Sequence, residues 1–493
     1  MAKIANRALP TLAIFFGVLG HFVSFYLHFF TVGFIVLTLL NFYLLRGQKT
    51  HALLHNFGIL AQARYILESI GPEFRQYLYS SDTEERPFNR VERSDVYRKA
   101  KGIDSSAAFG SQREYDATEI KLRHSLFPVD HDQVEKFELR FGEERGIKNI
   151  HTITKPIMIS AMSYGSLGSN AVRALARGAK KSEMTMNTGE GGYPKYHLME
   201  ECDLTFQLGT AKFGVRHENG DLDESKLESL CENPFIKMVE IKLSQGAKPG
   251  KGGLLPKEKI TDEIAELRGV GKGYDVVSPA HHSECKDAAS TVKFVRKIQE
   301  VTQLPVGIKL CYGQKEEVRA LLSEMIKQNI FPDYVSIDGG EGGTGAAPKG
   351  FMDDVGVPLF AALPIMRKFI NEFEIENKFK LICAGKLINP TKQFMAMSMG
   401  AHACYSARGF LLAIGCIQAL QCNKNTCPAG ITTHVPRLQD GLDIELKSDR
   451  VYNYVKALEK EHLDLLAAIG KRKYSDLSPG NLFMPTSLLE ARS

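Results

Sequence analysis

The sequence predicts an α/β protein, a (β/α)8 TIM barrel with an N-terminal transmembrane helical hairpin and a C-terminal helical extension. Three observations lead to this prediction. From residue 155 onward, eight short β-rich runs alternate with mostly helix-length intervals, and loops of small residues follow the runs. Before residue 50, a long stretch carries no charged side chain. The 493 residues are enough for one large barrel with appendages.

The N-terminal stretch, residues 9–45, is apolar and aromatic almost throughout. One membrane crossing needs about 20 such residues, and this stretch is nearly twice as long. We therefore expect two passes that turn around residues 27–31. Because basic residues such as Arg7 and Arg46 flank the stretch, both ends and the catalytic part are expected in the cytoplasm. The alternatives are one long tilted helix or a cleaved signal peptide, whose apolar core would be shorter.

Composition excludes two other classes of protein. The net charge of +5 arises from 62 basic and 57 acidic side chains without a long basic run in the soluble part, so we expect no nucleic-acid partner. Nine cysteines spread over a chain of this size do not form the dense framework of a small secreted domain. Reduced thiols in a cytosolic compartment fit better.

We expect four parts along the chain. Residues 1–49 form the hairpin, 50–139 a polar connecting region, 140–438 the barrel and 439–493 the helical extension, which packs on the barrel exterior and stops at Gly470. An insertion is expected after the second strand, and an open doubly wound sheet is the competing architecture. The eight expected strands are residues 155–162, 184–189, 239–245, 275–280, 305–311, 334–338, 379–385 and 403–407.

The active site of such a barrel lies at the C-terminal ends of its strands. There the sequence reads "AMSYGS", "NTGEGG", "QGAKPGKGG", "DGGEGGTGAAP", "AGK" and "ARG" in order. Glycines let backbone N–H groups approach a large ligand closely. Such barrels commonly bind phosphate with the loops after strands seven and eight, here Gly385 and residues 407–409, which suggests a phosphorylated cofactor. His281 and His282 are not expected to bind a metal, because adjacent strand residues point in opposite directions.

The stretch "GCIQALQCNKNTCPAG", residues 415–430, contains Cys416, Cys422 and Cys427. Their spacing is close enough to hold an iron–sulfur cluster, since cysteine thiolates are its usual ligands. Buried core cysteines are the plain alternative. A zinc site or a four-iron cluster would need a fourth ligand, which Cys383 or Cys404 could supply.

Taken together, "AMSYGS", "NTGEGG", "EIKLSQGAKPGKGG", "SPAHH", "GGTGAAP" and "GCIQALQCNKNTCPAG" resemble the FMN-binding synthase domain of glutamate synthase. The resemblance covers roughly residues 140–435, with the motifs in family order. It implies FMN on the C-terminal face of the barrel and a [3Fe-4S] cluster held by Cys416, Cys422 and Cys427. It also implies reduction of 2-iminoglutarate, made from 2-oxoglutarate and ammonia, to L-glutamate.

The resemblance further implies roles for single residues. Lys309 and Glu190 are the expected catalytic residues: Lys309 lies near the reduced flavin or a substrate carboxylate, and Glu190 handles a proton or orients the imine. Ser166 and Lys248 join Glu190 at the substrate. The residues expected to contact FMN are Ala161, Met162, Ser163, Gln245, Lys309, Gly342, Gly343, Gly385, Arg408 and Gly409.

The sequence also departs from the family pattern. No cysteine precedes Cys202, so we expect no glutaminase domain, and ammonia would come as free ammonium or from a separate glutaminase. No "GxGxxG" follows a strand and opens a helix, so no NAD(P)H or FAD domain is expected, and we also do not expect the family's C-terminal β-helix domain. Electrons would come from a ferredoxin or an NAD(P)H-oxidising flavoprotein.

Two alternatives stay open at this point. The chain acts on a related 2-oxo acid, or it is a membrane-associated FMN and iron–sulfur module that passes electrons without making an amino acid. Glu190 and Lys309 favour an aminase, because a pure electron carrier does not need groups that handle substrate.

Overall fold

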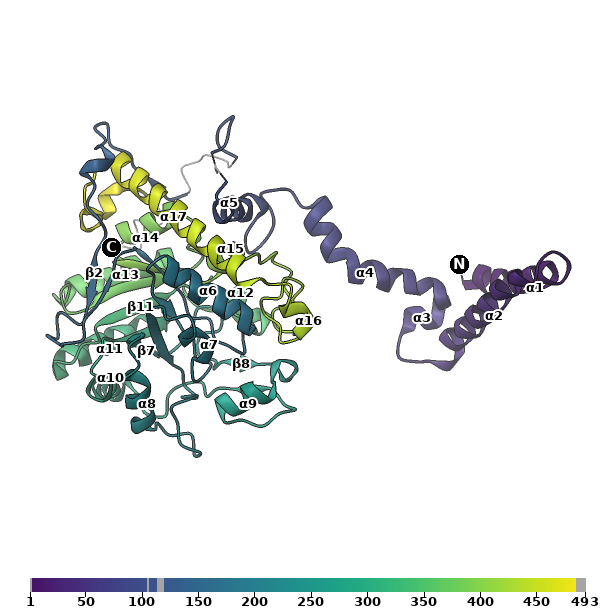
Figure 1. Cartoon of the computed structure of the whole chain (residues 1–493), viewed down its shortest axis with the longest axis horizontal. Coiled ribbons are helices and arrows are strands. Elements are labelled where there is room, and N and C mark those ends of the chain that lie inside the picture. The colour runs from purple at the N-terminus through teal and green to yellow at the C-terminus, as the bar shows by residue number, and fades with distance from the viewer. Residues whose placement is uncertain (1, 104–105, 113–118, 485–493) are drawn as a thin grey trace. The chain divides into compact units, whose positions relative to one another are not determined.

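The computed structural model describes residues 2–103, 106–112 and 119–484. The chain splits into two compact units, Met1–Glu92 and Arg93–Ser493. The second unit contains a closed barrel of eight parallel strands, as predicted, in the order β10-β11-β12-β13-β4-β5-β6-β7 (Figure 1). These strands are β4 (Ile157–Ile159), β5 (Met186–Asn187), β6 (Leu204–Leu208), β7 (Ile236–Lys242), β10 (Val306–Cys311), β11 (Tyr334–Asp338), β12 (Lys380–Ala384) and β13 (Ala403–Ser406).

One predicted barrel strand was wrong. Residues 275–280 contribute only β9 (Val276–Val277), which pairs antiparallel with β8 (Leu254–Leu255) outside the barrel. The strand missing from the prediction is β6, whose five residues are all buried. Both runs are short and apolar, and a local pattern does not identify the strand's partner. The insertion therefore follows β7, not the second strand, and spans residues 243–287, before the barrel helix α10.

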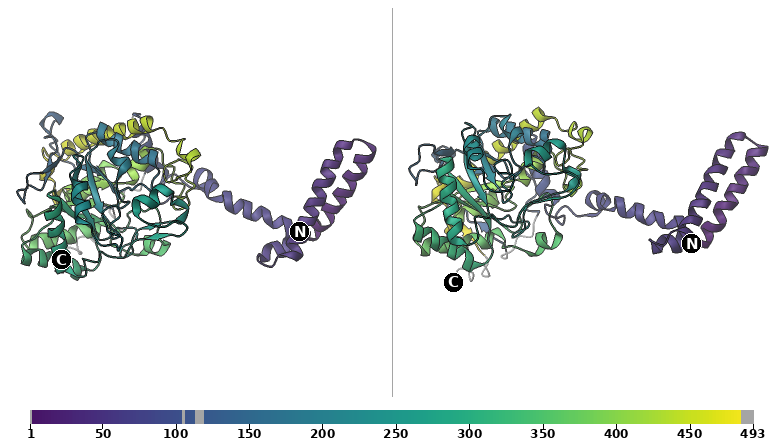
Figure 2. Two further views of the ribbon diagram at one scale, coloured as in Figure 1. Left: turned by 60° about the horizontal axis from the view of Figure 1, so that its bottom comes forward. Right: turned by 90° about the horizontal axis from the view of Figure 1, so that it is seen from below.

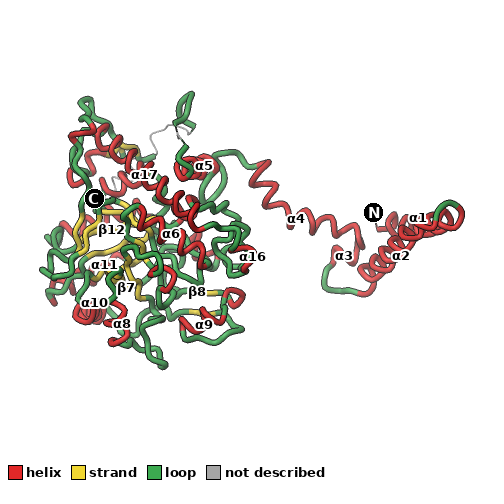
Figure 3. The backbone as a smooth tube through the Cα atoms, in the orientation of Figure 1, coloured by secondary structure: helices red, strands yellow, loops and turns green. Residues whose placement is uncertain are grey.

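Helices surround the barrel (Figure 3). Their amphipathic sequences bury small and aliphatic residues toward the strands, as in α6, where Ala171, Val172 and Leu175 are fully buried. The helices of this unit before α16 are α5 (Arg90–Ala100, which begins just before the boundary), α6 (Ser169–Lys181), α7 (Lys195–Leu198), α8 (Glu224–Cys231), α9 (Asp262–Arg268), α10 (Ala288–Thr302), α11 (Lys315–Gln328), α12 (Lys349–Asp354), α13 (Leu359–Glu372), α14 (Pro390–Ser398) and α15 (Arg408–Ala413).

An antiparallel strand pair packs against the N-terminal part of the barrel. It consists of β2 (Leu139–Phe141) and β3 (His151–Ile153). Phe141 is fully buried, and its ring lies edge-on to Tyr334 at the start of β11, with 5.5 Å between ring centroids. Because this end is filled by side chains, the loops at the opposite, C-terminal end of the strands are left to form the site.

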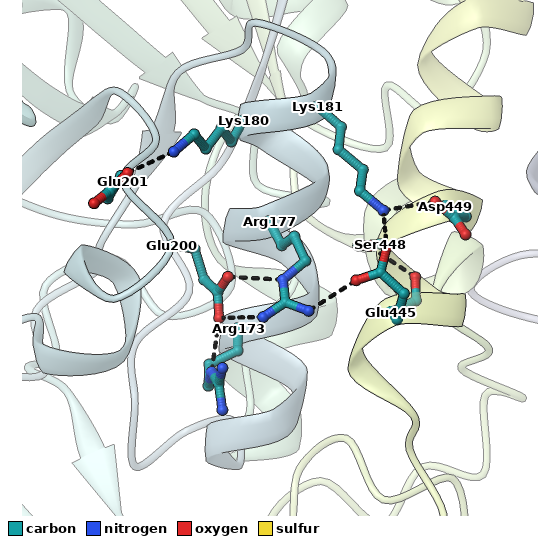
Figure 4. Close-up of polar contacts among 9 residues, drawn as sticks. All are labelled: Arg173, Arg177, Lys180, Lys181, Glu200, Glu201, Glu445, Ser448 and Asp449. Carbon is teal, nitrogen blue, oxygen red and sulfur yellow. Dashed lines mark hydrogen bonds and ion pairs between the residues drawn. The ribbon is translucent and has the colours of Figure 1, made fainter.

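The C-terminal extension packs on the barrel exterior, as predicted. After α16 (Pro436–Gln439), the long helix α17 (Ile444–Ala468) contacts α6, α14 and α15. Ion pairs join α17 to α6: Arg177 binds both Glu200 (2.7 Å) and Glu445 (2.8 Å), and Lys181 binds Asp449 at 2.7 Å (Figure 4). Near the C-terminus, β14 (Leu482–Phe483) pairs with β1 (Lys121–Leu122).

The first unit is helical. Helices α1 (Ala2–Phe22) and α2 (His28–Phe42) form an antiparallel hairpin, in which Phe16 stacks on Phe30 with centroids 5.3 Å apart (Figure 2). The hairpin turns at residues 23–27, earlier than expected, because Ser24 adopts an extended conformation that ends α1. Helices α3 (Ala52–Phe57) and α4 (Gln62–Phe74) follow.

Within the described residues, one helix, Phe25–Gly47, is long and apolar enough to cross a membrane by its length and composition. Its side chains are mostly exposed in this unit, including Phe29 at 71% and Leu39 at 65%. The two membrane passes predicted from the sequence are not established by this single helix.

Candidate active site

The predicted site residues gather at the C-terminal ends of the barrel strands. They come from seven of the eight strands or from the loops that directly follow them, and β6 supplies none. Ala161, Met162, Ser163 and Ser166 follow β4; Glu190 follows β5; Gln245 and Lys248 follow β7; Lys309 lies in β10; Gly342 and Gly343 follow β11; Gly385 follows β12; Arg408 and Gly409 follow β13.

Glu190 is bound by a lysine that the sequence reasoning missed. Lys242 Nζ donates to Glu190 Oε1 at 2.5 Å and to Gln245 Oε1 at 2.6 Å. The backbone packs tightly around this carboxylate, because a Cβ at Gly209 would lie 2.5 Å from Glu190 Oε2. The sequence held a signal for Lys242: in "VEIKL" two charged residues stand two apart within a buried strand, so both face the barrel interior.

Three cations act on the Glu190 carboxylate. Burial by itself raises the pKa of Glu190, but the charges of Lys242, Lys248 and Arg268 outweigh it and hold that pKa below its ordinary value. Glu190 is therefore ionised at neutral pH. We call Lys242, Lys248 and Arg268 the cation cluster.

Lys248 links two loops of the site. It is 2% exposed, and its Nζ donates to the carbonyl oxygen of Ala346 at 2.8 Å. Burial, followed by the charge of Lys242, lowers the pKa of Lys248 to about 8. Gln245 Nε2 donates to Thr344 Oγ1 at 3.3 Å. The loop after β7 thus holds the glycine-rich loop after β11.

Arg268 lies in the insertion and was also not predicted as a site residue from the sequence. It ends α9, is 7% exposed and donates to the carbonyl oxygen of Tyr164 at 3.3 Å. Burial lowers the pKa of Arg268 to about 10, so it keeps its charge at neutral pH. No local pattern connects Arg268 with "NTGEGG", because the contact depends on how the insertion folds over the barrel.

Lys309 lies inside the barrel among carboxylates. It is 5% exposed, and its Nζ lies 3.4 Å from Asp338 Oδ2. Fully buried Glu240 lies below it and accepts hydrogen bonds from Asn187 Nδ2 (2.8 Å) and Gln207 Nε2 (2.7 Å). Burial lowers the pKa of Lys309, but Asp338 and Glu240 outweigh burial and raise it, so Lys309 stays a cation.

Arg408 and glycines form the part of the face where a phosphate is expected. Arg408 Nη2 donates to the carbonyl oxygen of Glu341 at 2.7 Å. A Cβ at Gly343 would lie 2.8 Å from Arg408 Nε, so only glycine leaves this guanidinium its place. A guanidinium beside exposed backbone amides suits a phosphate group.

Residues 415–430, the cysteine loop, lie after α15. Burial raises the pKa of Cys416 to about 12. Burial also raises the pKa of Cys427, but N–H groups of Thr432 and Ile431 outweigh it and bring the pKa below its ordinary value, which favours a thiolate. Lys259 Nζ donates to the carbonyl oxygens of Cys422, at 3.3 Å, and of Ser166, which joins the cysteine loop to the loop after β4.

In the described part of the chain, no three His, Cys, Asp or Glu side chains are grouped to hold a metal ion. Cys383 and Cys404 face each other on β12 and β13 with 3.7 Å between sulfurs. Cys404 Sγ lies 4.0 Å from the carbonyl oxygen of Gln393 in α14, so this pair belongs to the layer between strands and helices. His282 is fully buried and its Nε2 lies 3.0 Å from the carbonyl oxygen of Lys242.

Comparison with known proteins identifies the family. The conserved region in glutamate synthase matches residues 92–472. The "Glutamate synthase large subunit-like protein YerD" of Bacillus subtilis is 38% identical over 461 residues, which cover 86% of this chain and 88% of that protein.

More distant relatives are glutamate synthases by name. The "Archaeal-type glutamate synthase (NADPH)" of Thermotoga neapolitana is 34% identical over 317 residues, covering 64% of this chain and 59% of that protein. The "Archaeal glutamate synthase (NADPH)" of Methanocaldococcus jannaschii is 34% identical over 344 residues, covering 69% of this chain and 63% of that protein. The chain thus spans about three fifths of these two proteins. With a barrel of eight parallel strands and a family match over most of its length, the chain belongs to the glutamate synthase family.

Proposed function

We propose that this chain is an oxidoreductase that reduces 2-iminoglutarate, formed from 2-oxoglutarate and ammonia, to L-glutamate with reduced FMN. The observation that carries the proposal is the arrangement of Glu190 among the three members of the cation cluster, at the same end of the barrel as Lys309. A carrier that only passes electrons has no use for a desolvated carboxylate surrounded by cations.

The charge of this group suits a dicarboxylate. Three cations, Lys242, Lys248 and Arg268, against the one carboxylate of Glu190 leave two positive charges. A 2-oxo dicarboxylic acid brings two negative charges. Because the cations are buried, their attraction for these carboxylates is weakened little by water.

Glu190 would act on the imine nitrogen. As a carboxylate, its Oε2 accepts a hydrogen bond from a protonated imine, which orients the carbon that is reduced. Oε1 stays bound to Lys242 Nζ. This lysine keeps Glu190 ionised, so the carboxylate favours the protonated, more electrophilic imine.

The residues at the strand ends fit FMN. Arg408 with Gly343 and Gly385 would hold the phosphate, and Ser163, Gln245 and Lys309 would lie along the ring system. When bound and reduced, FMN supplies the hydride for the imine carbon. Lys309, kept protonated by Asp338 and Glu240, would stabilise negative charge on the neighbouring ring.

The cysteine loop would hold a [3Fe-4S] cluster through Cys416, Cys422 and Cys427. The charges of Cys422 and Cys427 both act on Cys416, so the three thiols lie near one another, as the ligands of one cluster would. Electrons would come from a ferredoxin or an NAD(P)H-oxidising flavoprotein, and ammonia from free ammonium or a separate glutaminase.

The first unit would anchor the chain in a membrane through the α1 and α2 hairpin, with both ends in the cytoplasm. The apolar helix Phe25–Gly47 and the exposed aromatic side chains of the hairpin support this anchor. The basic residues Arg7 and Arg46 at its ends support the orientation.

The test is an anaerobic assay of the purified chain with dithionite, 2-oxoglutarate and ammonium or glutamine. We expect flavin reoxidation that depends on 2-oxoglutarate, together with formation of glutamate. A rate of flavin reoxidation that does not change when 2-oxoglutarate and the amine source are added would overturn the proposed aminase function. Separately, Cys422→Ser is expected to lose iron and keep FMN; a variant that keeps all its iron would refute the ligand assignment.

A further inference from the structure

The cysteine loop presents two large apolar side chains to solvent. Leu420 is 69% exposed and Ile417 is 38% exposed. Leu420 and Gln418 both have positive φ, 55° and 59°, a conformation that costs a non-glycine residue about 1 kcal/mol or more. The loop therefore holds an unfavourable backbone conformation while it exposes an apolar side chain, which is typical of a binding surface.

Basic side chains border this loop. Lys447 Nζ and Arg450 Nη1 of α17 would lie 3.0 and 4.0 Å from a Cβ at Gly415, the first residue of the loop. Burial lowers the pKa of Lys447, and the charges of Arg450 and Lys101 lower it further, with only Asp443 opposing them. Lys424 adds an exposed cation within the loop itself.

The two faces of α17 differ in how their charges are balanced. Toward α6, Glu445 and Asp449 bind Arg177 and Lys181 (Figure 4). Lys447 and Arg450, by contrast, make no ion pair within the described part of the chain. Unpaired cations beside an exposed apolar centre produce a local positive potential that attracts an acidic partner.

Hydrogen bonds hold the segment of the cysteine loop that carries Ile417 and Leu420. Tyr97 in α5 donates its hydroxyl to the carbonyl oxygen of Cys416 at 2.6 Å, and Arg93 Nη1 donates to that of Ile417 at 3.3 Å. Leu420 stands between Cys416 and Cys422 in the sequence. A protein bound at Leu420 therefore lies directly against the loop that carries the thiols.

We propose that Ile417 and Leu420, together with the cations Lys101, Lys447 and Arg450 near Gly415 at the start of the same loop, form a docking surface for an acidic one-electron carrier protein. An apolar centre with a charged rim is the usual construction of a transient protein interface. The inference rests on the proposed function, because only a chain supplied with electrons from outside needs such a surface. Two carriers would each lose one electron, and bound FMN would gain these two electrons and one proton from solvent.

The experiment compares the full chain with the double variant Lys447→Glu, Arg450→Glu. The matched control is Lys293→Glu, Arg296→Glu on helix α10, a lysine and an arginine that are also three residues apart and make no ion pair within the described part of the chain. The probe is an acidic two-iron ferredoxin. Calorimetry measures the affinity of the oxidised ferredoxin for the chain. Electron delivery is measured anaerobically as bleaching of the flavin, once with pre-reduced ferredoxin as the electron donor and once with dithionite alone.

For the double variant we expect about tenfold weaker ferredoxin binding and about tenfold slower ferredoxin-driven bleaching, with dithionite-driven bleaching unchanged. The wild-type affinity should fall with added salt and that of the variant should not. Leu420→Ser should weaken binding severalfold and keep the salt dependence. Should the double variant fail to fold, Leu420→Ser and the wild-type salt series still decide.

Three results would overturn the inference: a wild-type chain that does not bind the ferredoxin, equal effects of the double variant and its control, or a double variant that binds the ferredoxin normally but no longer co-sediments with phosphatidylserine vesicles. The last result would mark a membrane-binding surface. The binding measurement needs no turnover. If glutamate formation fails and charge reversal still abolishes binding, the proposed function has failed and the docking surface stands.

Discussion

The two units of the chain treat the same residue type in opposite ways. In the first unit, Phe22 and Phe25 are 79% and 75% exposed, whereas in the second unit Phe206, Phe369 and Phe410 are at most 1% exposed. The barrel and its helices bury most of their phenylalanines around one core, and the strongly exposed Phe109 and Phe127 of this unit lie in loops outside the barrel. Exposed phenylalanines in the helical hairpin agree with the membrane anchor proposed for the first unit.

Buried polar groups differ between the units as well. The first unit buries a neutral amide: Asn41 is 3% exposed, donates to Asn6 Oδ1 at 2.6 Å and accepts from the backbone of Ile59 at 2.9 Å. The second unit buries charges, Glu240 and Lys309 among them. Charges inside a protein require partners, and the polar side chains that point from the strands into the barrel interior provide them.

The largest expected effect comes from the charge at the centre of the second unit. Glu190→Gln removes the carboxylate that the cation cluster surrounds, and we expect kcat of dithionite-driven glutamate formation to fall roughly 10²- to 10⁴-fold. Membrane partition, a property of the first unit, should not change. The control is Glu201→Gln, an exposed carboxylate paired with Lys180. An activity within twofold of wild type would remove Glu190 from the mechanism.

The next effect concerns stability of the barrel unit. The Asp333 side chain is fully buried, and Arg145 binds it through Nε at 3.0 Å and Nη2 at 2.9 Å. Asp333→Ala leaves a partly buried guanidinium unpaired, which costs about 3–5 kcal/mol of unfolding free energy. Asp262→Ala, which breaks an exposed pair with Lys272, should cost less than about 1 kcal/mol. Unfolding in denaturant, monitored by release of the flavin, measures the free energy of unfolding of both variants. Equal losses in the two variants would contradict the expected difference.

A feature of this chain could be predicted from the sequence when it depends on neighbouring residues alone, and not when it depends on contacts between distant segments. The glycine loops after strands and the close cysteines are local patterns, so their place at one end of the barrel was predictable. Membership of β6 in the barrel was not, because "LTFQL" and "DVVSPA" are equally apolar and only their partners differ. The same applies to Arg268, which reaches Tyr164 from an insertion that begins about eighty residues later.

A substitution at matched positions tests the contrast between the units directly. Ile35 and Ile326 are similarly exposed, 47% in α2 and 39% in α11. Ile35→Arg places a charge near the middle of the apolar helix, which costs about 3 kcal/mol if that helix lies in a bilayer. Ile326→Arg on a water-facing helix should change stability by no more than about 0.5 kcal/mol. We expect only Ile35→Arg to move protein from the membrane to the soluble fraction. No shift in either variant would contradict the anchor.

The smallest effect is a pH dependence at Lys248. Its pKa, lowered to about 8 by burial and by Lys242, puts its charge change just above neutral pH. Above pH 8 the lysine loses the charge that would bind a substrate carboxylate, so the Kd of 2-oxoglutarate should rise about fivefold to tenfold between pH 7.5 and 9.5. Glu190 keeps its charge over this range, and Arg268, with a pKa lowered to about 10, starts to lose its charge only toward the upper end of it.

Folding responds with the opposite sign. Because the pKa of Lys248 in the folded chain lies below its ordinary value of 10.5, the neutral lysine is favoured there, and its contribution to stability increases from about pH 8 toward 10.5. Binding and stability therefore separate above pH 8: the chain binds its substrate less tightly while this residue destabilises it less. Lys248→Arg keeps a charge at every pH in the range, so its Kd should stay flat. A rise in Kd as steep as that of the wild type would assign the titration to another group.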